Sequence, residues 1–143
     1  MPLAVDTLER GGVNPSRIIL GHISNTAVSD MTLLEDLLKR GVYLQFDVFG
    51  NPWQLKMNDK AAADAIVTLA KKGFSRQLLV SHDMCTKFHL TRFGGAGLQH
   101  IHRVILPYLR SNGLSELQIQ EIMISNPSRV LPLAMATSHP LNQ

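Results

Sequence analysis

Short apolar runs alternate with helical patterns from about residue 16 to residue 134 of the chain. The apolar runs are RIILGH (Arg17–His22), VYLQFDVF (Val42–Phe49) and QLLVSHD (Gln77–Asp83). The second run alternates in character along its length, and all three have the length and the branched or aromatic content of strands. The pattern therefore predicts three strands, at about residues 17–22, 42–49 and 77–82.

Between these runs, apolar residues recur at helical spacing. Ser29 or Asp30 can cap a helix that ends at Gly41, and Asn58 or Asp59 can open a second helix. A glycine-containing loop after the third strand leads to a further helix, whose apolar side is expected to hold Leu98, Ile101, Ile105 and Tyr108.

Two motifs predict helices near the end of the chain. Ser115 and Gln118 have the spacing of a capping box. Asn126 followed by Pro127 has the pattern of an N-cap and first helical residue.

Strands separated by helices predict right-handed crossovers and a parallel sheet, so the fold class is α/β. Only three strands are indicated, whereas a closed β/α barrel needs eight strands over about 250 residues. The pattern alone leaves two alternatives, a small open α/β domain or part of a barrel.

Composition narrows the class of protein. The 143 residues fit one domain, and the 45% hydrophobic content excludes intrinsic disorder. The net charge of +3 is small and spread out, so we expect no nucleic-acid partner. A single cysteine, Cys85, excludes an internal disulfide. No signal-peptide pattern and no apolar run of about 20 residues is present. We expect a soluble cytoplasmic protein with no membrane partner.

Candidate chemistry lies at the ends of the predicted strands. His22 and Asp83 end the first and third runs, and the carboxyl ends of parallel strands share one edge. An imidazole and a carboxylate that converge there suit a divalent metal. The alternative is that each side chain only bonds a loop. Asp47, in the second run, either faces a pocket or caps a loop.

Other polar residues are less specific. Trp53, Lys87, His89 and Arg92 lie on the loops after the second and third strands, where they either touch a substrate or are solvated. His100 and His102 have the look of a ligand pair, but on a helix residues two apart face different directions.

Four segments together resemble one protein family. They are SRIILGHISNT, RGVYLQFDVFG, RQLLVSHDMCTKFHLTRFGGAGLQHI and IMISNPSRVL, in this order. In this order they are similar to the C-terminal half of phosphotriesterase-family hydrolases of the amidohydrolase superfamily, especially the phosphotriesterase-related branch. The similarity extends from about Leu8 to Leu133.

The resemblance implies a fold and a cofactor. The fold would be the C-terminal portion, strands six to eight with their helices, of a TIM (β/α)8 barrel of the metal-dependent hydrolase type. The cofactor would be two divalent metals, most often zinc. His22 matches the metal-binding histidine after strand six, and Asp83 matches the metal-binding aspartate after strand eight. Asp83 would also accept the proton of the attacking hydroxide.

The family's other ligands lie on strands one, four and five, which have no counterpart here. We therefore expect residues 1–143 to be a partial hydrolase domain that is inactive alone. The full-length parent, for which a homo-oligomer is left open, would hydrolyse an ester, lactone, amide or phosphotriester bond of a small catabolic substrate. The alternative is a catalytically inactive half-barrel that acts as an interaction or assembly module.

Overall fold

The computed structural model describes residues 1–51 and 59–131, and these build a three-stranded parallel sheet. The strands are β1 (Ile19–Leu20), β2 (Tyr43–Phe46) and β3 (Leu78–Val80), in the order β1-β2-β3. Leu44 of β2 lies in register with Leu20 of β1 and with Leu78 of β3. The α/β class and the parallel arrangement are confirmed.

Each strand is shorter than the runs predicted at 17–22, 42–49 and 77–82. The chain turns before β1, in a short 3-10 turn over Pro15–Arg17, and leaves the extended conformation again at His22. Val48 and Phe49 lie beyond the paired part of β2 yet are buried. Their apolar character therefore reflects burial of the following loop, which the alternating pattern does not distinguish from strand pairing.

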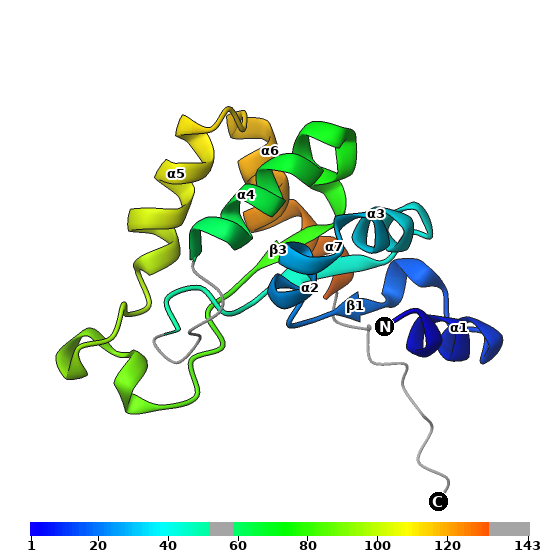
Figure 1. Ribbon diagram of the computed structural model, residues 1–143, viewed down its shortest axis with the longest axis horizontal. Helices are drawn as coiled ribbons and strands as arrows, with labels where there is room; N and C mark the ends of the chain where they lie inside the picture. The colour runs from blue at the N-terminus through cyan, green and yellow to red at the C-terminus, as the bar shows by residue number, and fades with distance from the viewer. Residues whose placement is uncertain (52–58, 132–143) are drawn as a thin grey trace, which may run out of the picture.

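Seven α-helices surround the sheet in the described residues (Figure 1). They are α1 (Pro2–Arg10), α2 (Ser24–Ser29), α3 (Met31–Lys39), α4 (Asp59–Leu69), α5 (Leu106–Ser111), α6 (Glu116–Gln120) and α7 (Asn126–Val130). Wider helical turns at 70–74, 101–105 and 121–125 extend α4, precede α5 and join α6 to α7. In the described ranges, no helix combines the length and the apolar character that a membrane span needs.

The main core lies between the sheet and the helices α3, α4, α5 and α6, and Val5 of α1 also belongs to it. Figure 1 shows α1 beside α3, at the β1 side of the molecule. Its fully buried side chains include Leu37, Leu44, Phe46, Ile66, Leu69, Leu78, Ile105 and Leu109. A second, smaller cluster holds Tyr43, Leu79 and Val130, with Ile19 packed against it. Because Tyr43 and Leu79 alternate with core residues along their strands, this cluster covers the other face of the sheet.

Local capping signals were predicted correctly at two helices. The Asp30 side chain accepts the Leu33 N–H at 2.9 Å, which makes Asp30 the N-cap of α3, whereas Ser29 belongs to α2. The capping box of Ser115 and Gln118 is present at α6. The prediction that Leu98 lies on the apolar side of a helix is wrong. Leu98 is exposed and precedes the helical turn, which begins at Ile101.

The prediction that Asn126 caps a new helix is wrong. Helical structure continues from α6 to α7, and the wider turn at 121–125 precedes Pro127, whose ring a regular turn would crowd. The Asn126 side chain is 0% exposed, and its Nδ2 donates to the carbonyl oxygens of Ser75 and Leu78, both at 2.7 Å. Asn126 therefore joins the last helix to the beginning of β3.

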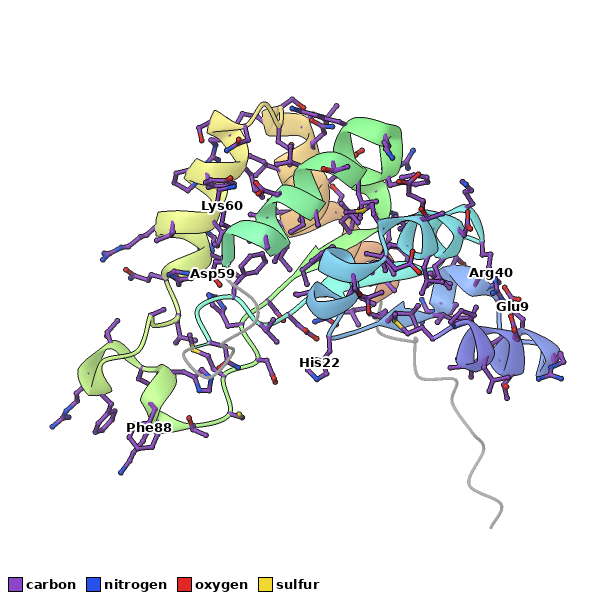
Figure 2. All side chains as sticks on the ribbon, in the orientation of Figure 1. Glu9, His22, Arg40, Asp59, Lys60 and Phe88 are labelled. Atoms are coloured by element: carbon purple, nitrogen blue, oxygen red, sulfur yellow. The ribbon has the colours of Figure 1, made fainter. Side chains whose placement is uncertain are left out.

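Helix α1 is held by one buried apolar side chain and a cluster of charges. Val5 lies in the core, and the guanidinium of Arg40, just after α3, donates to Asp6 at 2.7 Å and to Glu9 at 2.6 Å. Figure 2 shows Arg40 and Glu9 facing each other between the two helices. This cluster links the first helix to the end of α3.

Replacing Arg40 with alanine is expected to lower the free energy of unfolding by a small but measurable amount, because two partly exposed carboxylates lose a shared partner. Urea unfolding followed by circular dichroism measures the loss, which should shrink in high salt. The matched control is Arg17→Ala, since Arg17 is an exposed arginine of a short turn. Equal losses for the two variants would contradict a specific role for Arg40.

Candidate functional site

Three chemistry-bearing residues follow the carboxyl ends of the three strands. His22 comes two residues after β1, Asp47 directly after β2 and Asp83 three residues after β3. Since the strands are parallel, these ends lie at one edge of the sheet. His22 (φ 55°) and Asp83 (φ 49°) are the non-glycine residues with positive φ in the described ranges. Such sparsely populated conformations are typical of functional sites.

Asp47 holds His22 through both its backbone and its ring. The carboxylate of Asp47 is buried and accepts the His22 backbone N–H at 3.0 and 3.1 Å. The same carboxylate lies 3.0 Å from Nδ1 of His22. A carboxylate can only accept, so Nδ1 carries a proton, and in the neutral ring Nε2 then keeps its lone pair. Asp47 thus caps the turn at His22, one of the two roles predicted for it.

The His22 ring points outward, with 68% of its side chain exposed, and Figure 2 shows it projecting from the ribbon. Gly21 makes this arrangement feasible, because a Cβ at that position would lie 2.9 Å from Oδ2 of Asp47. A histidine whose Nδ1 is fixed by a carboxylate while Nε2 is accessible has the geometry of a metal ligand with its supporting acceptor.

Asp83 lies at the other side of this edge, and its carboxylate is exposed. Within residues 1–51 and 59–131, no hydrogen bond or ion pair engages it. The chain before it is well held, since the Ser81 N–H donates to the Phe46 carbonyl at 3.0 Å and Gln45 donates to the Ser81 hydroxyl at 3.2 Å. The carboxylate is therefore anchored through its backbone and accessible to a ligand.

His82, the residue before Asp83, faces into the protein. Its Nε2 accepts the Ile101 N–H at 3.3 Å. Burial lowers the pKa of His82 below its ordinary value, and the nearby His100 and His102 lower it further. A neutral ring is consistent with Nε2 acting as an acceptor, so His82 ties the end of β3 to the turn that begins at Ile101.

The four predicted substrate contacts lie in different surroundings. Trp53 falls outside the described residues. Lys87 lies over the rings of Phe88 and Phe93, at 5.7 and 5.6 Å from their centroids. Arg92 lines a surface cleft of about 440 Å³ beside the segment 96–104.

His89 is turned into its own loop and is 1% exposed. Its Nδ1 accepts the Thr86 N–H at 3.3 Å and lies 3.0 Å from the Thr86 hydroxyl, whereas its Nε2 has no partner in the described part of the chain. The loop that carries Lys87, His89 and Arg92 projects from the body of the molecule (Figure 1). Within the described ranges, no hydrogen bond joins Lys87, His89 or Arg92 to His22 or Asp83, so contact with substrate stays a prediction.

His22 and Asp83 are residue types that bind divalent metals, but two side chains are fewer than a catalytic zinc site uses. An imidazole nitrogen and a carboxylate oxygen are both zinc ligands. No group of three or more His, Cys, Asp or Glu side chains that could hold a metal ion occurs among the described residues. Catalytic zinc sites use three protein ligands, so His22 and Asp83 would make up part of one.

Two named relatives match most of this chain and are much longer than it. The chain is 34% identical over 137 residues to an N-acetyltaurine hydrolase of Dictyostelium discoideum, covering 90% of this chain and 37% of the relative. It is 35% identical over 132 residues to a phosphotriesterase-related protein of Drosophila sechellia, covering 87% of this chain and 37% of the relative. The chain thus spans little more than a third of the length of these relatives.

Solved structures are similar to this chain in fold as well as in sequence. A phosphotriesterase homology protein from Escherichia coli, complexed with phosphate in its active site, superimposes with a TM-score of 0.79 at 25% identity, over 87% of this chain and 42% of that one. A resiniferatoxin-binding protein from Rhodobacter sphaeroides gives 0.79 at 32% identity, over 88% and 37%. The phosphotriesterase family model matches residues 2–131. The chain therefore belongs to the phosphotriesterase family.

Proposed function

We propose that this chain supplies part of the active site of a metal-dependent hydrolase, with His22 and Asp83 as two of its metal ligands. The observation that carries the proposal is the contact of Asp47 with Nδ1 of His22, at 3.0 Å, which leaves Nε2 accessible at the carboxyl edge of the sheet. Relatives named as hydrolases support it.

In this proposal β1, β2 and β3 are strands six to eight of a (β/α)8 barrel, and the chain is the C-terminal portion of a longer domain. Two observations support this assignment. The chain corresponds to 37% of its relatives' length, close to three strands of eight. Among the described residues, β1 and β3 each pair on one side only, so each has an edge on which a further barrel strand could pair.

The resident metals would be two zinc ions, and the remaining ligands would come from the rest of the barrel. A bound divalent metal supplies hydroxide at neutral pH by lowering the pKa of its water. His22 contributes Nε2, in an orientation fixed by Asp47. Asp83 would hold a metal through its carboxylate and accept the proton of the attacking hydroxide.

The substrate is proposed to be a small molecule with a hydrolysable ester, lactone, amide or phosphotriester bond. Three of the relatives are named N-acetyltaurine hydrolases, which favours an N-acyl amide among these four. The fold itself does not choose between them, because specificity in barrels resides in the loops.

Zinc titration of the 143-residue chain, followed through the His22 ring signals by NMR, tests the proposal. The His22 signals should respond to zinc, and the response should be strongly weakened in Asp83→Ala. Elemental analysis of the purified, monodisperse chain should find fewer than two tightly held metals. The matched control is His102→Ala, which removes an exposed histidine and should leave the response intact. A zinc response that does not depend on Asp83 would refute the proposed ligand pair.

A second candidate function is assembly without catalysis. The one-sided pairing of β1 and β3 in the described residues favours it, since exposed strand edges promote association with another chain. Sedimentation velocity with and without zinc separates the two candidates. Association that needs no metal, together with no zinc response at His22, would favour the assembly module.

A further inference from the structure

Three segments that are distant in the sequence meet at the carboxylate of Asp59, the first residue of α4. Its Oδ1 accepts the Gly50 N–H at 3.0 Å, from the chain that follows β2. Its Oδ2 contacts Nε2 of His100, from the end of the loop that follows β3. Figure 2 shows Asp59 at the start of α4, beside the chain that enters the helical turn at Ile101. One carboxylate thus bridges two loops.

The approach of the two loops is close at Gly50. Its φ is 74°, and a Cβ there would lie 2.7 Å from the Ala96 Cβ and 3.0 Å from Cδ2 of His100. Only glycine accommodates both the left-handed conformation and this contact. The backbone after β2 therefore packs directly on the end of the loop after β3, and Asp59 holds the two from one side.

The contact is sheltered and connected to the candidate site. The His100 side chain is 15% exposed and that of Asp59 is 32% exposed, so water competes less than at an open surface pair. The next residue, Ile101, donates its N–H to His82, which precedes Asp83. Gly50 follows Asp47 by three residues. The cluster of Gly50, Asp59 and His100 therefore links the backbone of two site residues.

We propose that Asp59 and His100 form a positioning pair, which holds the backbone after β2 against the loop after β3 and so fixes how these loops border the candidate site. The inference rests on the proposed function only for the site that the loops border. His100 acts through Asp59, because the Gly50 N–H is bonded to Asp59 and not to His100. Neither residue is assigned a contact with substrate or metal.

Amide hydrogen exchange at Gly50, measured by NMR near neutral pH, tests this directly. His100→Ala leaves the acceptor of the Gly50 N–H in place, yet should raise its exchange rate about tenfold, because Asp59 loses the contact that orients it. His100→Gln keeps a donor at similar reach and should restore most of the protection. Asp59→Ala removes the acceptor, and adding His100→Ala to it should cause little further increase.

His102→Ala is the matched control, since His102 is an exposed histidine two residues further on and no hydrogen bond of it is seen within the described ranges. It should leave Gly50 exchange unchanged. Unfolding curves are measured for every variant, to detect a general loss of stability. If Asp59→Ala is destabilised as a whole, Asp59→Asn, which keeps one oxygen acceptor, replaces it. Unchanged exchange at Gly50 in His100→Ala, or an equal rise in His102→Ala, would overturn the positioning pair.

The same samples separate this inference from the proposed function. The zinc response of His22 reports on the ligand pair, whereas Gly50 exchange in the absence of zinc reports on Asp59 and His100. A wild-type chain with no zinc response and a His100-dependent Gly50 amide would reject the proposed function and retain the positioning pair. The reverse result would retain the function and reject the pair.

Discussion

Replacing Asn126 with alanine is expected to lower the free energy of unfolding by about 3 kcal/mol. The amide is fully buried, and its Nδ2 donates to the carbonyls of Ser75 and Leu78, both at 2.7 Å. Alanine leaves these two carbonyl oxygens without their donor at the beginning of β3, and it also creates a small cavity. Urea unfolding followed by circular dichroism measures the change.

Asn112→Ala is the control for this prediction. Its Nδ2 donates to the Tyr108 carbonyl at 2.9 Å, but at a partly exposed helix end where water can replace it. The expected loss is below about 1 kcal/mol. Asn126→Asp should destabilise the chain at least as much as alanine does, because a carboxylate would face two carbonyl oxygens. An Asn126→Ala chain as stable as Asn112→Ala would show that the joint between α7 and β3 contributes little.

The overall fold follows from the sequence pattern because the pattern is periodic. Three apolar runs separated by helical spans predict parallel strands, since a helix is the usual crossover between them. The extent of each strand does not follow in the same way. Val48 and Phe49 continue the apolar character of β2 while the paired part has already ended at Phe46. Burial and pairing both select apolar residues, so one sequence pattern has two structural causes.

Capping could be predicted where the partner is near in the chain. Asp30 bonds the backbone three residues on, and Ser115 pairs with Gln118 over the same distance. Asn126 has the local pattern of a cap, yet its side chain bonds backbone 48 and 51 residues away. Contacts of this kind depend on how helices pack against strands, and no local spacing signals them.

Some residues of the candidate site could also be predicted from the sequence, and others could not. His22 and Asp83 were found because they end apolar runs, and parallel strands bring such ends to one edge. The sequence left Asp47 with two alternatives, because the direction of its side chain depends on the left-handed turn at His22. The pair of Asp59 and His100 was missed altogether. Its members are 41 residues apart, and the sequence pattern offered only His102, two residues from His100, as a partner for it.

Asp47→Ala is expected to weaken zinc binding at His22 by about 10- to 100-fold, the range for losing the partner that orients a metal-ligating histidine. The variant removes the acceptor for both Nδ1 and the backbone N–H of His22, contacts of 3.0 to 3.1 Å. The ring can then rotate and exchange tautomers, so Nε2 presents its lone pair for a smaller fraction of the time. Zinc titration followed by the His22 ring signals measures the apparent affinity.

Asp36→Ala removes an equal charge from an exposed pair with Lys39 and should leave zinc affinity unchanged. Asp47→Asn should fall between wild type and alanine, because an amide oxygen can accept one of the two N–H groups but not both equally well. Gly21→Ala offers an independent approach, since its Cβ would lie 2.9 Å from Oδ2 of Asp47 and displace the carboxylate without removing it. Wild-type affinity in both Asp47→Ala and Gly21→Ala would mean that the orientation of His22 does not limit zinc binding. In that case the contact between Asp47 and His22 would serve the strained turn after β1 alone.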